Sequence, residues 1–131
     1  TIVSLDREES VNGYISAPST LPGQAFGFVF LDCLLESEAE PGSVFLGRPW
    51  RSTAKVAFIR CEMGRHIADV GWDNWDNPEN EKTAEFAEYG NHGPGVKRRV
   101  PWALMLDARQ AQRFSPRSVL SGPDSWEPFV H

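Results

Sequence analysis

Short apolar segments recur along the chain at a fixed spacing. They are FVFLDC at 28–33, VAFIRC at 56–61 and AEFAEY at 84–89. In this alignment Phe30, Phe58 and Phe86 are 28 residues apart. A constant period predicts that each segment is a short β-strand lying on its equivalent in the preceding winding of the chain. We therefore expect the three phenylalanines to line up in neighbouring layers.

A second, weaker set pairs residues 13–17 (GYISA) with residues 44–48 (VFLGR) at about the same period. Turn signals such as Asn12-Gly13 separate the segments. No segment between them has the dozen helical residues that a parallel α/β sheet needs for its crossovers. The pattern predicts an all-β solenoid of parallel windings. A sandwich of antiparallel hairpins is the second choice, because it does not require the fixed recurrence.

Helical patterning occurs only toward the C-terminus. Residues 107–114 (DARQAQRF) predict a short helix with Asp107 as its N-cap. Ser115-Pro116 predicts the start of another helix, with Gly122 after its end. The expected layout is a single domain over 1–131, with solenoid windings over about 1–96 and a short helical C-terminal tail over about 97–131.

Composition and charge narrow the function classes. The 131 residues are 40% hydrophobic, which is enough for one packed core, and the net charge of −5 argues against a nucleic-acid partner. No apolar run approaches the roughly 18 residues of a membrane span, so we expect no membrane segment. The histidines and acidic residues lack metal-ligand spacing, so we expect no metal or cofactor. Cys33 and Cys61 are within disulfide range if their windings stack, but we favour buried free thiols.

Four segments occur in a specific order: GYISA at 13–17, LGRPW at 46–50, GWDNW at 71–75 and EYGNHGPG at 88–95. Together with WEP at 126–128, this order resembles the C-terminal part of the pectin methylesterases (pectinesterases), carbohydrate esterases with a right-handed parallel β-helix. The resemblance covers nearly the whole chain, and LGRPW is quite specific in this context. It implies an enzyme that removes methyl esters from the galacturonate units of pectin. It also implies a secreted or periplasmic location, because pectin is an extracellular polymer.

The resemblance assigns roles to four residues. Arg48 of LGRPW is the implied partner of an aspartate nucleophile, since a guanidinium fork keeps a carboxylate ionised and aimed. Trp50 and Trp75 match substrate-contacting positions, where aromatic faces suit the apolar faces of sugar rings. Thr53 matches a position that contacts substrate in some members of the family. The alternatives are a turn arginine, packing tryptophans and a surface hydroxyl.

The aspartates of the family, a nucleophile and a general acid, precede the GYISA-like segment in motifs that this chain lacks. Asp6 and Asp32 lie in other contexts. We therefore expect N-terminal windings of the same protein to supply the aspartate pair, and residues 1–131 alone to be inactive. The second hypothesis is a non-catalytic polysaccharide-binding β-solenoid. A third, a calcium-dependent pectate lyase, is disfavoured because LGRPW belongs to the esterase pattern.

Overall fold

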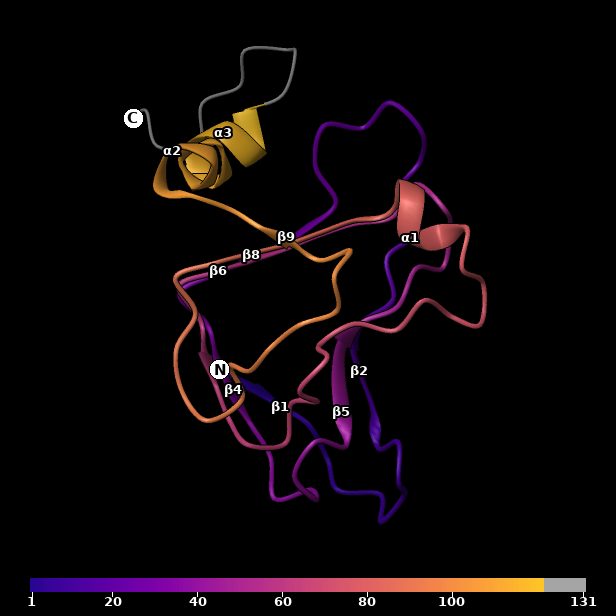
Figure 1. Cartoon of the computed structure of the whole chain (residues 1–131). Helices are drawn as coiled ribbons and strands as arrows, with labels where there is room; N and C mark the ends of the chain where they lie inside the picture. The colour runs from indigo at the N-terminus through magenta and orange to yellow at the C-terminus, as the bar shows by residue number, and fades with distance from the viewer. Residues whose placement is uncertain (122–131) are drawn as a thin grey trace.

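The computed structural model describes residues 1–121 and arranges their strands in three sheets (Figure 1). Sheet A contains β1 (Ile2–Val3), β4 (Leu34–Glu36) and β7 (Glu62–Met63). Sheet B contains β2 (Gly13–Ser16) and β5 (Val44–Gly47). Sheet C contains β3 (Phe28–Leu31), β6 (Lys55–Ile59), β8 (Glu85–Tyr89) and β9 (Leu104–Met105).

The chain visits the three sheets in the repeating order A, B, C, and each strand pairs in parallel with its equivalent in the next winding. This arrangement is a parallel β-helix, as the recurring segments predicted. In the third winding sheet B continues as isolated parallel bridges, Val44 with Ile67 and Gly47 with Trp72. The buried core fills the space that the three sheets enclose, and it includes Leu35, Leu46 and Phe58.

The register confirms two of the predicted alignments and corrects a third. Gly13 pairs with Val44 in sheet B, and Phe30 pairs with Phe58 in sheet C. The rings of Phe30 and Phe58 stack with centroids 4.4 Å apart. Phe86, however, does not pair with Phe58; it lies beside Val56, at a spacing of 30 residues. The third winding is longer than the second, because its connection to β8 contains α1 (Asn80–Thr83).

Trp72 fills the position that the shifted register leaves open in the aromatic stack. Its ring stacks on Phe86 with centroids 4.5 Å apart and meets the edge of Phe58 at 5.8 Å. The buried aromatic column therefore runs from Phe30 through Phe58 and Trp72 to Phe86. A side chain from a loop of the third winding completes a stack that the sequence period assigned to strands alone.

The C-terminal segment forms the predicted short helices. Asp107 caps α2 (Ala108–Ala111) through a capping box with Gln110, and η1 (Gln112–Phe114) follows. The Ser115 hydroxyl accepts a hydrogen bond from the Ser118 amide at 3.1 Å, at the start of α3 (Pro116–Ser121). The predicted stop at Gly122 lies outside the described residues.

The tail packs against the outer face of sheet C. Leu106 and Phe114 cover a small apolar cluster of Ala57, Ile59 and Ala87, whose side chains point away from the main core. Strand β9 extends sheet C to Met105, within the segment assigned from the sequence to the tail. Within residues 1–121, no helix is long and apolar enough to cross a membrane.

The two cysteines are free thiols. Cys61 is fully buried, and burial raises its pKa to about 11. Its sulfur donates weakly to the carbonyl of Phe30 at 3.4 Å. A thiol in this environment stays protonated and acts as a small apolar packing group.

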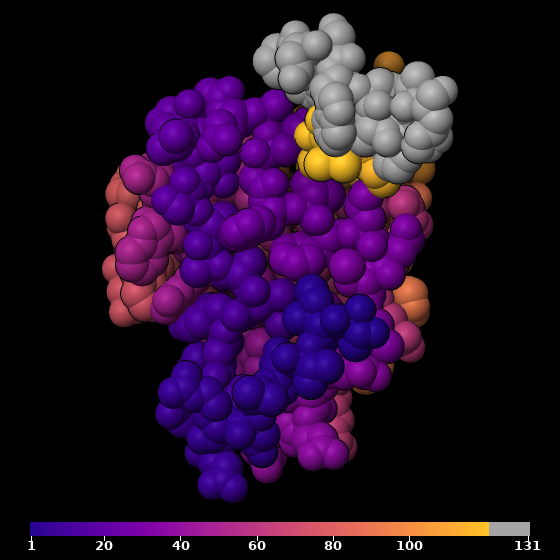
Figure 2. Space-filling model, turned by 180° about the vertical axis from the view of Figure 1, so that it is seen from behind, coloured from indigo at the N-terminus to yellow at the C-terminus, as the bar shows by residue number. Residues whose placement is uncertain are grey.

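The first winding covers one broad face of the molecule (Figure 2). Each of its strands has a single neighbour, so sheets A, B and C all present an unpaired edge on this side. Val3, Leu5 and Phe28 are large apolar side chains exposed in this winding. An open parallel edge with exposed apolar groups is a surface on which a further winding can stack.

Candidate functional site

The LGRPW segment continues the parallel pairing of sheet B beyond the end of β5. The Arg48 amide donates to the Ser16 carbonyl at 3.2 Å, and the Trp50 amide donates to the Pro18 carbonyl at 3.1 Å. These bonds fix the backbone of the segment against the strand of the first winding. The two side chains that the resemblance marks as functional therefore leave from a backbone segment that is hydrogen-bonded to the first winding.

Gly47 is required by the close packing immediately before Arg48. A Cβ atom at this position would lie 2.6 Å from the Ser16 hydroxyl and 3.0 Å from the ring of Trp72. Neither neighbour has room to move, because the Ser16 hydroxyl donates to a buried backbone carbonyl and Trp72 is part of the aromatic column. The glycine thus lets three consecutive windings approach one another at the base of the site.

Two aromatic rings hold the guanidinium of Arg48. Its Cζ lies 3.8 Å from the centroid of the Trp75 ring and 4.6 Å from that of Tyr14. The two rings meet edge to face at a centroid distance of 6.2 Å. Cation–π contacts of this kind contribute about 0.5–2 kcal/mol each, depending on desolvation.

The Arg48 Nε is buried and has no hydrogen-bond partner within the described part of the chain. Buried donors are normally paired, and an unpaired one costs about 1–3 kcal/mol. A guanidinium held by rings, with an unpaired donor, is suited to an acceptor supplied from outside these residues. A carboxylate is the acceptor that a guanidinium binds most strongly.

Asp73 connects the two rings that surround Arg48. The Tyr14 hydroxyl donates to Asp73 Oδ2 at 2.8 Å, and the Trp75 amide donates to Asp73 Oδ1 at 3.1 Å. Burial, followed by the hydrogen bond and charge of Asp73, raises the pKa of Tyr14 above its ordinary 10.0. The phenol is therefore a neutral donor throughout the physiological range.

The structure brings together two of the four residues that the sequence predicted, Arg48 and Trp75. Trp75 is 43% exposed and Trp50 is 60% exposed, so both present ring surface to solvent. Trp50 is not among the rings that stack on Arg48. The Thr53 hydroxyl donates to the Thr20 carbonyl at 2.7 Å, which occupies its proton within the protein. The substrate contacts expected of these side chains stay predictions.

Three further residues of this cluster were not predicted from the sequence: Tyr14, Phe45 and Asp73. Tyr14 and Phe45 are register partners whose rings stack at 5.5 Å on the outer face of sheet B. The alternation within GYISA and VFLGR was a usable signal, because it places these two rings on one face, opposite Ile15. Nothing in the local sequence links Asp73 to Tyr14, which is 59 residues away.

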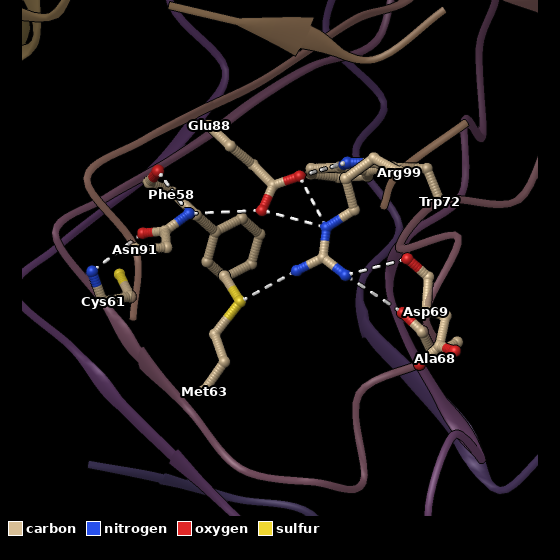
Figure 3. Close-up of polar contacts among 9 residues, drawn as sticks. All are labelled: Phe58, Cys61, Met63, Ala68, Asp69, Trp72, Glu88, Asn91 and Arg99. Carbon is tan, nitrogen blue, oxygen red and sulfur yellow. Dashed lines mark hydrogen bonds and ion pairs between the residues drawn. The ribbon is translucent and has the colours of Figure 1, made fainter. Parts of the chain in front are cut away.

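A second arginine cluster lies inside the solenoid, and it also escaped the sequence analysis (Figure 3). Arg99 Nε donates to Glu88 Oε2 at 2.9 Å, and the side chains of this ion pair are only 3% and 2% exposed. The Trp72 indole donates to the same oxygen at 3.1 Å, and Asn91 donates to the other at 3.2 Å. Glu88 is thus fully surrounded by donors.

The remaining nitrogens of Arg99 are also occupied. One donates to the carbonyls of Ala68 and Asp69 at 3.2 and 3.1 Å, and the other points to the Met63 sulfur at 3.3 Å. This cluster has no open donor for a ligand, so its role is structural. Within residues 1–121, no group of three or more histidine, cysteine or acidic side chains is placed to hold a metal ion.

Comparison with known proteins gives consistent results over nearly the whole chain. A family model described as Pectinesterase matches residues 3–123. Pectinesterase 31 of Arabidopsis thaliana is 37% identical over 121 residues, which are 90% of this chain and 38% of that protein. The chain spans about a third of the length of the curated relatives it matches.

Solved structures agree with the sequence relatives. A pectin methylesterase from Yersinia enterocolitica superposes with a TM-score of 0.77 at 29% identity, covering 92% of this chain and 45% of that one. A pectin methylesterase mutant in complex with a hexasaccharide gives a TM-score of 0.76 at 27% identity, covering 98% of this chain and 44% of that one.

Proposed function

Because the chain belongs to the pectinesterase family, we propose that it forms part of an enzyme that hydrolyses the methyl esters of galacturonate units in pectin. The observation that carries this proposal is the guanidinium of Arg48, which two rings hold while its buried Nε has no partner among the residues that the structure describes. Such a group is preorganised for a carboxylate. The substrate class is supported by the hexasaccharide complex of a similar pectin methylesterase.

The proposed reaction uses two aspartates from outside this chain. One carboxylate attacks the ester carbonyl and forms a covalent acyl-enzyme, while the second carboxyl group protonates the departing methanol. The second group then takes a proton from water, which hydrolyses the acyl-enzyme. Arg48 keeps the nucleophile ionised and aimed, and its contacts with the rings of Tyr14 and Trp75 limit the orientations of the guanidinium.

We propose that further windings of the same protein supply the aspartates and stack on the first winding. Two observations support this: the unpaired edges of the three sheets, and the third of its relatives' length that the chain spans. Trp50, Trp75 and Thr53 would line the path of the pectin strand. Because pectin is an extracellular polymer, we propose a secreted or periplasmic protein.

The test uses Arg48→Ala in the full protein, with methanol release from methylated pectin as the measurement. Loss of a charged group that stabilises the reacting carboxylate should lower turnover about 100-fold or more. Arg51→Ala is the matched control, because Arg51 is an exposed neighbour whose Nε donates to the Ser19 hydroxyl. The control should retain nearly all activity.

Near-normal turnover of Arg48→Ala would remove this residue from the catalytic site. Strong methanol release by residues 1–131 alone would overturn the assignment of the aspartates to other windings. Binding of pectin without methanol release by the full protein would favour the alternative, a non-catalytic polysaccharide-binding β-solenoid. Exposed Trp50 and Trp75 would serve that function equally well.

A further inference from the structure

We propose that Asp73 is a positioning residue that fixes the guanidinium of Arg48 by holding both of the rings that stack on it. This inference rests on the proposed function of Arg48 and deepens it. The cluster draws one element from each of three windings. Tyr14 comes from β2, Arg48 follows β5, and Asp73 and Trp75 lie in the loop that follows the sheet B bridge of the third winding.

The carboxylate of Asp73 uses its two oxygens for different partners. Oδ2 accepts from the Tyr14 hydroxyl at 2.8 Å, and Oδ1 accepts from the Trp75 amide at 3.1 Å. Each partner supplies one of the two rings that lie over the Arg48 guanidinium. The Asp73 side chain therefore connects both rings of the cation site, although Tyr14 is 59 residues away from it in sequence.

A backbone hydrogen bond fixes the position of Asp73 beside the site. The Asp73 amide donates to the Gly47 carbonyl at 3.1 Å, one residue before Arg48. Trp75 and Asp76 both have left-handed backbone torsions, with φ of 57° and 55°, which side-chain-bearing residues rarely adopt. The bond from the Trp75 amide to Asp73 Oδ1 closes an Asx turn immediately before these two torsions. Loss of this hydrogen bond should let the loop, and with it the indole of Trp75, move away from Arg48.

Asp73 acts through the rings and does not neutralise Arg48. Among residues 1–121, no ion pair within 4.0 Å joins Asp73 to Arg48. The carboxylate is occupied by the Tyr14 hydroxyl and the Trp75 amide, and the Arg48 Nε stays unpaired. An aspartate paired directly with the arginine would compete with the proposed nucleophile. This arrangement orients the guanidinium and leaves it available.

The test compares Asp73→Ala and Asp73→Asn with Asp76→Asn in the full protein. Asp76 is an exposed acid in the same loop, and asparagine tolerates its left-handed torsion, so this control removes the same charge without touching the cluster. We expect Asp73→Ala to lower kcat on methylated pectin about tenfold or more. Asp73→Asn keeps one acceptor and the side-chain volume. We therefore expect its kcat to lie between that of Asp73→Ala and that of the Asp76→Asn control.

Two further measurements separate positioning from a general structural effect. In an Arg48→Lys background, Asp73→Ala should cause little additional loss, because the group that it positions is already changed. The phenol of Tyr14, followed by absorbance titration against a Tyr14→Phe reference, should ionise at lower pH in Asp73→Asn. The substitution removes the negative charge of Asp73, which raises the pKa of Tyr14, and keeps the positive charge of Arg48, which lowers it.

The outcomes distinguish this inference from the proposed function. If Arg48→Ala is inactive while both Asp73 variants keep kcat within twofold of wild type, the positioning role is wrong and the proposed function stands. An equal fractional loss of kcat from Asp73→Ala in the wild-type and Arg48→Lys backgrounds would also overturn the positioning role of Asp73. If Arg48→Ala is fully active, the proposed function itself fails. Should Asp73→Ala not fold, Asp73→Asn and the Tyr14 titration decide the question.

Discussion

Arg48 and Arg99 are both placed near a tryptophan and an acid of the third winding, yet their surroundings differ. Arg99 lies in the solenoid interior, where its Nε pairs with Glu88 and its other nitrogens have acceptors. Arg48 lies on the outer face of sheet B, where two rings contact its guanidinium and its Nε has no partner in the described part of the chain. A complete set of partners indicates a structural cross-link, whereas stacking with an unpaired donor indicates a group kept ready for a ligand.

The adjacent tryptophans show the same difference. Trp72 is 2% exposed, donates its indole N–H to Glu88 and stacks in the core. Trp75, three residues later, is 43% exposed and lies over Arg48. The left-handed torsion at Trp75 lets the chain turn its second indole outward. One short motif, GWDNW, thus contributes to both the core and the site.

Breaking the buried pair should produce the largest effect. Glu88→Ala leaves the Arg99 guanidinium buried without its counter-charge, which typically costs about 3–5 kcal/mol. Denaturant unfolding of the full protein is the measurement. The control is Glu79→Ala, which breaks an exposed pair with Lys82 and should change stability by less than about 1 kcal/mol. Equal losses from the two variants would contradict a structural role for the buried pair.

Alanine substitutions of the two tryptophans should have different effects. Trp72→Ala should destabilise the fold by about 3–5 kcal/mol, because it opens a large cavity in the aromatic column. Trp75→Ala should lower the unfolding free energy by no more than about 2 kcal/mol, the upper value of its cation–π contact with Arg48. It should also weaken binding of a galacturonate hexasaccharide roughly tenfold, or about 1.4 kcal/mol. Calorimetric titration and thermal unfolding measure the two effects. A destabilised Trp75→Ala with unaltered affinity would reverse the assignment.

The smallest expected change is one of pH dependence. His66 is fully buried, and neither of its ring nitrogens has a hydrogen-bond partner among residues 1–121. Burial lowers its pKa below 6.5. The unfolded chain therefore binds the proton more readily, so stability falls as the pH drops below 6.5 and levels off beyond the folded-state pKa. His66→Leu should flatten this part of the stability profile, measured by denaturation between pH 7 and roughly pH 5. His92→Gln, at an exposed position, should keep the wild-type slope.

The fold was predictable from the sequence because parallel windings repeat their strand positions. The alignment of GYISA with VFLGR and that of Phe30 with Phe58 both follow from the period. The shift of Phe86 was not predictable, since it depends on the length of the connection that contains α1. Strand alternation carried a further signal, because Glu88 lies two residues after the inward-facing Phe86 and so also points inward.

The site was predictable only in part. Arg48 and Trp75 lie within motifs, so resemblance to a family brings them to notice. The role of Asp73 depends on contacts with Tyr14 from another winding, and no local pattern encodes a contact over that separation. Glu88 and Arg99 pair over 11 residues, and no motif in the sequence links them. Residues that act through partners from other windings are therefore the ones that sequence reasoning misses.

The extra length of the third winding has an evolutionary consequence. Strand β8 pairs with β6 in full despite the two added residues, because the excess is taken up at the corner that contains α1. That corner is joined to the site loop, since the Asn74 amide group donates to Glu81 at 2.8 Å. Insertions and deletions at this corner can therefore change the loop that carries Asp73 and Trp75 without changing the stacked interior.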